Sequence, residues 1–313
     1  MAPQRILVIK LSALGDFVQA SGPMKAIHAA HPDAHITLLT TGPYVAMGQA
    51  TGWFDEVWSD GRPDWSDLPA VWRLLSRLRG ARFDRVYDLQ TQSRTIRYFQ
   101  LLWPRRPDWS GNAPGAKFRY AGPERDRLHI QDSQRNQLAV AGIPQTPPPD
   151  VSWLKGEGGF DLQSPYALLV PGGAPHRPAK RWPAERYGEL AARLAREGIT
   201  PVVLGHGPDE AGLAEIIRAS EPSAVVLVGK TKLGDIADLA RAAALAVGND
   251  TGPMHVIAAG GCPSLVLFSA DSDPALSAPR PSGEGRVEIL REMDLEDLAV
   301  APVWSVVETL RNR

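Results

Sequence analysis

Short apolar runs alternate with longer amphipathic stretches along both halves of the chain. Runs rich in β-branched and aliphatic residues are typical of buried strands, and apolar residues three and four apart are typical of helices. Strands that alternate with helices predict parallel sheets with crossover connections. The predicted strands are residues 5–11, 35–41, 56–58 and 85–90 in the first half, and 166–173, 200–205, 224–229, 245–250 and 264–270 in the second.

A segment rich in proline and glycine, residues 142–166, separates the two halves and suits an exposed connector. The chain has 313 residues, which is long for one core and fits two domains of roughly 150 residues each. We therefore predict an α/β protein with two Rossmann-like, doubly wound parallel sheets that face each other. The predicted domains are residues 1–155 and 156–313. One alternative is that the last helix of the second domain packs back on the first domain.

Composition narrows the class of protein. The chain is 43% hydrophobic and 22% charged with a formal net charge of -1, so its overall balance does not indicate a nucleic-acid-binding protein. Its single cysteine, Cys262, excludes an internal disulfide and a multi-cysteine zinc site, and favours a reducing compartment. The first residues lack a signal-peptide pattern, and no segment reaches the roughly 18 apolar residues of a membrane span. We expect a cytoplasmic protein.

Charge is unevenly distributed. Residues 71–135 hold 14 Lys and Arg against 6 Asp and Glu, a local net charge of +8. One interpretation is a solvated, arginine-rich helix face. The other is a surface for an anionic, partly lipidic partner, because further arginines lie among aromatic residues. These residues are Arg94, Arg97, Arg105, Arg106 and Arg119, with Trp103, Trp109 and Phe118.

Ligands of parallel α/β sheets bind at the carboxyl ends of strands, where helix N-termini present unpaired N–H groups. The turn in residues 245–261, LAVGNDTGPMHVIAAGG, is such an end. Gly252 lets a bulky anion approach the backbone, so a diphosphate fits there. His255 follows Thr251 by four residues, so both share one helix face. The alternative is an ordinary helix start, capped by Asp250 or Thr251, with His255 on the surface.

A second turn, PGGAPHRPAKRWPAERY, ends a strand at Gly172 and Gly173. Lys180 lies in the loop before the next helix, from which it could reach a phosphate. Alternatively, Lys180 is solvated and Trp182 is a hydrophobic staple beneath the helix start. The spacing of glycine, lysine and hydroxyl groups is not that of a P-loop here, nor in VLVGKT further along.

The third turn, IKLSALGDFVQASGPMKAIHAAHP, ends a strand near Leu11 and places Asp16 at the start of a helix that runs to about Ala30. The loop lacks G-x-G-x-x-G, which disfavours an NAD-dependent dehydrogenase. Taken alone, Asp16 could be a helix cap or a first-turn acid.

The segments RILVIKLSALGD, FDRVYDLQTQSR, PGGAPHRPAKRWPAERY and VGNDTGPMHVIAAGGCPSLVLF together resemble glycosyltransferase family nine, the ADP-heptose:lipopolysaccharide heptosyltransferases. The resemblance covers nearly the whole chain in order. It implies the GT-B architecture, with the active site in a cleft, the donor nucleotide on the C-terminal domain and the acceptor on the N-terminal one. It also implies an inverting transfer of heptose from a nucleotide diphosphate sugar, ADP-heptose, to an anionic lipopolysaccharide core acceptor.

The resemblance carries roles to matching positions. Asp16 would be the catalytic base, Lys180 and the backbone amides of Thr251 and Gly252 would stabilise the diphosphate, Asp250 would order the turn, and His255 would lie near the sugar or phosphate. Gly172 and Gly173 would also adjoin the donor, Asp209 or Glu210 would accept ribose hydroxyls, and Thr231 would approach the base. The predicted acceptor residues are Ser12, Arg94 and Arg97, of which the two arginines come from the basic segment. Inner-core Kdo, a heptose and another cell-envelope glycan all stay open as the acceptor. After the last strand, Ser269, Ala270 and Asp271 depart from the family's usual glycine, proline and threonine.

Other functions remain open at this point. A GT-B transferase or epimerase that uses a UDP-sugar is one, and a non-catalytic protein that binds a nucleotide sugar or envelope glycan is another. Asp16 favours catalysis, because binding alone needs no carboxylate there. The sequence indicates no dedicated metal site, so we expect transfer without metal or cofactor. We expect no nucleic-acid partner, and a peripheral contact with the cytoplasmic face of the inner membrane.

Overall fold

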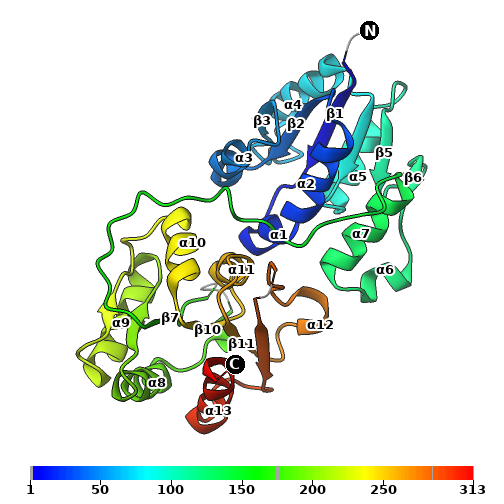
Figure 1. Ribbon diagram of the computed structural model, residues 1–313. Helices are drawn as coiled ribbons and strands as arrows, with labels where there is room; N and C mark the ends of the chain where they lie inside the picture. Colours follow the sequence, from blue (N-terminus) through cyan, green and yellow to red (C-terminus); the bar gives the residue numbers. More distant parts are fainter. Residues whose placement is uncertain (1–2, 174–176, 284, 313) are drawn as a thin grey trace. The chain divides into compact units, whose positions relative to one another are not determined.

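The structure is a computed structural model that describes residues 3–173, 177–283 and 285–312 (Figure 1). The chain forms two compact units, the first ending at Pro147 and the second beginning at Pro148. This division falls inside the proline-rich connector. Each unit contains one six-stranded sheet in which all strand pairs are parallel. The predicted pair of doubly wound parallel sheets is confirmed.

The first sheet has the strand order β3-β2-β1-β4-β5-β6. Its order reverses between β1 and β4, which makes their carboxyl ends the switch point where ligands bind in such sheets. The strands are β1 (Arg5–Ile9), β2 (His35–Thr40), β3 (Glu56–Ser59), β4 (Arg85–Asp88), β5 (Asp108–Gly111) and β6 (Phe118–Arg119). The helices are α1 (Leu14–Gln19), α2 (Ser21–Ala30), η1 (Gly42–Tyr44), α3 (Val45–Ala50), α4 (Leu68–Ala81), α5 (Ser93–Leu101), α6 (Pro123–Arg127) and α7 (Ile130–Val140).

The second sheet repeats this arrangement in the order β12-β11-β10-β7-β8-β9, with its switch point between β7 and β10. The strands are β7 (Tyr166–Val170), β8 (Thr200–Val203), β9 (Val225–Val226), β10 (Leu245–Asn249), β11 (Ser264–Phe268) and β12 (Val287–Arg291). The helices are η2 (Pro178–Lys180), α8 (Ala184–Arg196), α9 (Gly207–Ser220), α10 (Leu233–Ala242), α11 (Gly252–Ala259), α12 (Pro274–Ser277) and α13 (Val300–Arg311).

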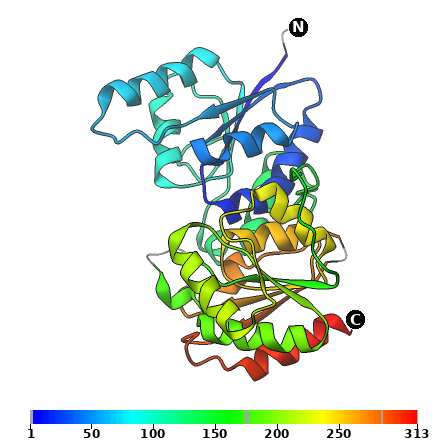
Figure 2. The same cartoon turned by 90° about the vertical axis from the view of Figure 1, so that its left-hand side faces the viewer.

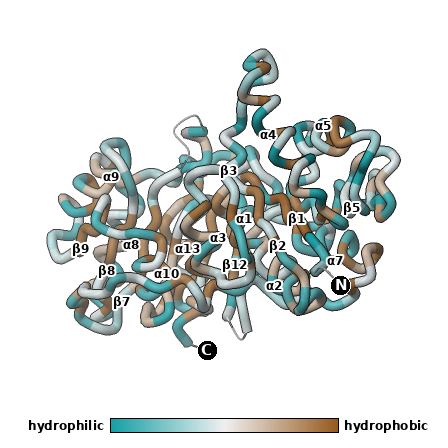
Figure 3. The backbone as a smooth tube through the Cα atoms, turned by 90° about the horizontal axis from the view of Figure 1, so that it is seen from above, coloured by the Kyte–Doolittle hydropathy of each residue, from teal (hydrophilic) through white to brown (hydrophobic). Residues whose placement is uncertain are grey.

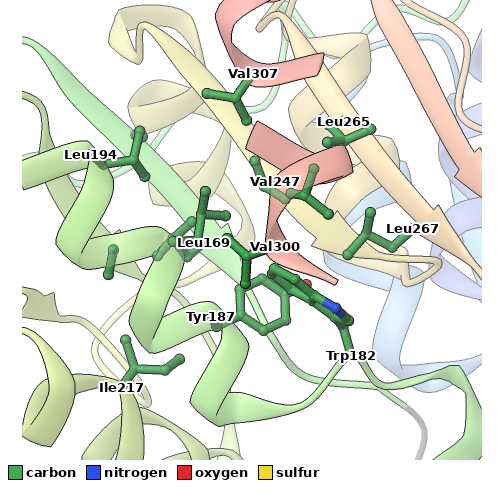
Figure 4. Packing of buried hydrophobic residues seen from close by; sticks show 14 of the residues in the cluster. Leu169, Trp182, Tyr187, Leu194, Ile217, Val247, Leu265, Leu267, Val300 and Val307 are labelled. Carbon is green, nitrogen blue, oxygen red and sulfur yellow. The ribbon is translucent and has the colours of Figure 1, made fainter. Parts of the chain in front are cut away.

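Buried aliphatic side chains hold each sheet against its helices, and the brown strands in Figure 3 mark these apolar layers. In the second unit, Trp182 and Tyr187 pack edge to face with ring centroids 4.8 Å apart (Figure 4). Trp182 precedes α8 and Tyr187 lies in its first turns, so the predicted hydrophobic staple is present. Trp109, predicted for a surface, instead lies fully buried in the first core.

Helix α13 packs on α8, β10 and β11 and buries Val300, Val303 and Val307 in the same core (Figure 2). The last helix thus belongs to the core of the second unit. Among the described helices, none combines the length and the apolar character needed to cross a membrane.

Two local expectations are corrected. The helix predicted from Asp16 to about Ala30 begins earlier, at Leu14, and is divided at Ala20 into α1 and α2. Strands β5, β6 and β12 were not predicted, because β5 and β12 mix polar and apolar residues and β6 is only two residues long.

Candidate active site

Asn249 organises the carboxyl edge of the second sheet. It ends β10 and is fully buried. Its amide nitrogen donates to the carbonyls of Pro171 (2.8 Å) and Gly172 (3.1 Å), while its oxygen accepts from the Trp182 backbone N–H and the Tyr187 hydroxyl, both at 3.1 Å. One side chain therefore fixes the glycine turn and the lysine loop at the end of the same strand.

Lys180 and Asp250 form a buried ion pair at this edge. The Lys180 Nζ lies 2.6 Å from the Asp250 Oδ2, and each side chain is 11% exposed. The Ser272 hydroxyl donates to the same carboxylate oxygen at 2.8 Å. Ser272 belongs to the loop that departs from the family pattern, so this loop supports the Asp250 carboxylate. The two turns predicted from separate motifs are brought together, and the ammonium group of Lys180 is held in one position.

The glycine turn is locked to α9 by Glu210. Its carboxylate accepts from the backbone N–H of Gly173 at 3.2 Å and of His206 at 2.6 Å. A Cβ atom at Gly172 would come within 2.0 Å of the Glu210 Oε1, so only glycine fits there without displacing that carboxylate. A carboxylate has about four lone-pair sites, so Glu210 retains acceptor capacity beyond these two contacts. Asp209 is exposed in the first turn of α9, and Thr231 lies half-buried after the turn that follows β9.

Helix α11 begins at this edge, where the backbone N–H groups of Thr251 and Gly252 have no partner among the described residues. Thr251 is its N-cap residue in extended conformation, and Gly252 is the first helical residue. The Thr251 hydroxyl oxygen is buried and has no hydrogen-bond partner among the described residues. Such a helix start carries a partial positive charge and free N–H donors, which suit an anion. His255 is buried one turn further along, so the surface position considered for it is wrong.

The carboxyl edge of the first sheet carries a group of charged side chains that were not predicted. Lys10 follows β1 and is only 2% exposed, with its Nζ 3.5 Å from the Leu89 carbonyl oxygen and 4.0 Å from the Asp16 Oδ2. Burial lowers the pKa of Lys10, and the charges of Asp16 and Asp88 oppose that shift. Asp88 ends β4, accepts from the Thr91 backbone N–H at 2.8 Å, and has a pKa that burial raises to about 6.

Asp16 stands in the first turn of α1 as its third residue, where its Oδ2 accepts from the Ala13 backbone N–H at 3.3 Å. It is therefore a first-turn acid rather than the cap residue. Its side chain is 43% exposed, which leaves a carboxylate oxygen open to a ligand. The neighbouring loop is fixed by Gln90, whose Oε1 accepts from the backbone N–H groups of Leu11 (2.8 Å) and Ser12 (3.3 Å).

The predicted acceptor residues differ in how firmly they are held. The Ser12 hydroxyl accepts a hydrogen bond from Arg62. Arg94 donates to the Tyr98 hydroxyl and to the Pro63 carbonyl, each at 3.1 Å. The guanidinium groups of Arg94 and Arg97 both lie over the Trp65 ring, 5.1 and 5.0 Å from its centroid. Arg94 therefore also braces the loop that contains Pro63.

Comparison with known proteins shows the family to which this chain belongs. The model of glycosyltransferase family 9 (heptosyltransferase) matches residues 118–288. The lipopolysaccharide heptosyltransferase 2 of Escherichia coli K12 is 30% identical over 324 residues, which cover 87% of this chain and 86% of that protein. The chain belongs to glycosyltransferase family 9.

Solved structures agree with the fold of this glycosyltransferase. The family 9 glycosyltransferase from Veillonella parvula aligns with a TM-score of 0.80 at 21% identity, covering 99% of this chain and 97% of that one. E. coli heptosyltransferase WaaC with ADP aligns with a TM-score of 0.76 at 20% identity, covering 98% and 100%. The GT-B architecture predicted from the sequence is thereby confirmed.

Within each unit, the glycosyltransferase thus groups most predicted residues at one sheet edge. The second unit joins the glycine turn, Lys180, Asp250 and the start of α11, while the first places Ser12 and Asp16 beside β1. Sequence reasoning missed Lys10, Asp88 and Asn249. Each is a polar residue at or directly after the end of a buried strand, and that position is the signal that could have identified them.

Proposed function

We propose that this glycosyltransferase moves a heptose, with inversion, from ADP-heptose to an anionic lipopolysaccharide core acceptor. The observation that carries the proposal is the buried Lys180–Asp250 pair at the strand end where α11 begins, with the Thr251 and Gly252 N–H groups unpaired among the described residues. This places a fixed positive charge and free N–H donors at one strand end, as a departing diphosphate requires. The heptosyltransferase 2 relative supports heptose, and the likeness to an ADP-bound structure supports adenine.

In the proposed reaction, Asp16 takes the proton of an acceptor hydroxyl while that oxygen forms a bond to the anomeric carbon. The bond from the anomeric carbon to the diphosphate oxygen breaks, and ADP leaves with the electron pair. A single displacement of this kind inverts the anomeric centre. Asp16 suits the task because it is partly exposed and oriented by the Ala13 N–H, with Lys10 4.0 Å away.

On the donor side, Lys180 and the first amides of α11 would stabilise the charge that develops on the diphosphate. Asp250 and Ser272 hold the ammonium in place before the donor arrives, so little reorganisation is needed. Glu210 would keep the glycine turn open, and its free lone pairs would accept a ribose hydroxyl. His255, buried in α11, would contact the sugar or phosphate.

Nucleotide binding separates this proposal from the alternatives. ADP at 100 times its dissociation constant should stabilise the protein by about 2.7 kcal/mol, because only the folded state binds it. We expect thermal shifts to rank ADP above UDP, GDP and NAD. Stabilisation by UDP alone would favour a UDP-sugar enzyme, and stabilisation by NAD alone would contradict a transferase.

The acceptor side has its own test. Arg94 and Arg97 lie in the first turns of α5, which follows the carboxyl end of β4. Replacing both with alanine should raise the acceptor KM about 10-fold or more, with a smaller change in the donor KM, because charge-assisted bonds to the acceptor's anionic groups are lost. Arg97→Ala alone should also raise the acceptor KM. It is the cleaner variant, because Arg94 also braces the loop that contains Pro63.

A matched control comes from α4. Arg73 is exposed and belongs to the same basic segment, so Arg73→Ala should leave the acceptor KM unchanged. If Arg97→Ala and Arg73→Ala give equal acceptor kinetics, the arginines of α5 are a solvated face.

We also propose that this enzyme is a peripheral protein at the cytoplasmic face of the inner membrane, because the proposed acceptor is linked to a lipid.

A further inference from the structure

A cavity of about 950 Å³ in the first unit lies away from the predicted acceptor residues. Its lining includes Asp84, which directly precedes β4, and Asp108, which begins β5. It therefore opens at the amino ends of these strands, whereas Ser12 and Asp16 follow the carboxyl end of β1. In a parallel sheet these are opposite edges, so the cavity is separate from the proposed acceptor site.

The cavity carries unpaired positive charge. Arg79 and Arg82 line it from the end of α4, and Arg105 and Arg106 line it from the segment after α5. All four are exposed, and none lies within 4.0 Å of a carboxylate oxygen in residues 3–173, 177–283 and 285–312. The two carboxylates that line the cavity, Asp84 and Asp108, have other partners.

Those acids have their own partners. The Asp84 Oδ2 accepts from the Arg5 backbone N–H at 2.7 Å. The Asp108 Oδ2 lies 2.6 Å from the Lys117 Nζ, which balances its charge. The four arginines thus leave the cavity with an excess of positive charge, and an anion is the complementary ligand.

Apolar side chains are exposed beside this charge. Trp103 lines the cavity and is 65% exposed, and Leu101 nearby is 38% exposed. Arg79 donates to the Leu101 carbonyl oxygen at 2.5 Å, which joins the ends of α4 and α5. An exposed tryptophan among arginines is the pattern of a membrane interface, where the ring enters the headgroup region and the cations meet phosphates.

Helix α4 extends the same surface along the unit. Leu68, Trp72 and Arg79 are spaced by four and seven residues, so they share one stripe of the helix. Leu68 is 70% and Trp72 67% exposed. The helix spans about 21 Å, from the loop after β3 to the turn before β4, and so runs from the carboxyl edge of the sheet to its amino edge. A flat surface against this stripe would meet the cavity and still leave the carboxyl edge accessible.

We propose that the cavity binds phosphate headgroups of anionic phospholipids, and that Trp103 and the exposed stripe of α4 complete a membrane-docking surface. This inference rests on the proposed peripheral membrane contact and assigns that contact to one surface of the first unit. Docking through the flank of the first unit holds the enzyme on the membrane that carries a lipid-linked acceptor, while the acceptor glycan uses the opposite sheet edge.

Vesicle co-sedimentation tests the docking surface. The probes are vesicles of phosphatidylcholine alone and vesicles with one-third phosphatidylglycerol. One variant combines Arg105→Gln with Arg106→Gln, and a second carries Trp103→Ala. The matched control combines Arg196→Gln with Arg218→Gln, which alters two exposed arginines of α8 and α9. We expect wild type and control to bind only the anionic vesicles, the double arginine variant to lose roughly 30-fold in partition coefficient, and Trp103→Ala to weaken binding as well.

Several results would overturn the proposal. Equal vesicle binding by wild type and the arginine variant is one, and loss of binding in the control variant is another. Release of the protein by inorganic phosphate, at the concentration of lipid phosphate used, would indicate a small-anion site. Binding of a DNA duplex that is lost in the same variants would indicate a nucleic-acid surface. Transfer to a deacylated, soluble acceptor reports the proposed function separately, and we expect it unchanged in these variants.

Discussion

Replacing Asp16 with asparagine should lower turnover by about 10²- to 10⁴-fold, the usual contribution of a general base. The amide oxygen of asparagine can still accept from the Ala13 N–H, so the start of α1 should keep its shape. It cannot take the acceptor proton at neutral pH. Nucleotide binding should stay close to that of the wild type, because the diphosphate contacts proposed above all come from the second unit. Steady-state kinetics at saturating donor and acceptor measure the loss.

Asp235 offers a matched control for the structural part of this change. It is the third residue of α10, and its Oδ2 accepts from the Lys232 backbone N–H at 2.8 Å, as Asp16 does from Ala13. Asp235 is buried and its Oδ1 also accepts from the Glu157 backbone N–H at 3.0 Å, so Asp235→Asn should show an upper limit to the structural cost of such a change, without the loss of turnover. Retention of more than about a tenth of wild-type turnover in Asp16→Asn would return Asp16 to the role of a first-turn acid.

Lys180→Ala should reduce kcat/KM for the donor by about 10²- to 10³-fold, the range seen when one preorganised charge-stabilising group is removed. The variant loses the ammonium group and also leaves the Asp250 carboxylate, 11% exposed, with the Ser272 hydroxyl as its side-chain partner among the described residues. That uncompensated negative charge would repel the diphosphate, so ADP affinity should fall as well. Isothermal titration with ADP and donor kinetics measure the two effects.

A double-mutant comparison separates these causes. Lys180→Ala combined with Asp250→Asn removes the stranded carboxylate, so it should recover ADP affinity in part but not turnover. Lys232→Ala is the control for an ordinary lysine, because that side chain is 72% exposed and its ion pair with Glu157 is worth little. If ADP binds Lys180→Ala as tightly as wild type and turnover is normal, Lys180 has no part in the phosphate site.

The sequence predicted the buried strands well because apolar residues follow one another without interruption, as in residues 245–248 and 265–268. It missed β12 and β5, where polar residues interrupt the run. It also joined α1 and α2, because their break at Ala20 occurs without a proline or glycine at that position.

For the site, the sequence located the turns but not the contacts that build them. Lys180 and Asp250 are 70 residues apart, and they meet only because β10 pairs with β7. The same holds for Asn249, whose partners are 62 to 78 residues away. Lys10 looked like the end of an apolar strand, and its burial beside Asp88 depends on the pairing of β1 with β4. Short motifs carry no information on such long-range pairing.

The most direct measurement is the product formed from ADP-heptose and a defined, heptose-deficient lipopolysaccharide acceptor, with no metal ion or cofactor added. Mass spectrometry should show one heptose gained per acceptor and an equal amount of ADP released, and NMR should show the inverted anomeric configuration. A UDP-sugar offered in parallel should give no product. Absence of heptose transfer by protein that binds ADP, transfer from the UDP-sugar instead, or retention of configuration would contradict the proposed function.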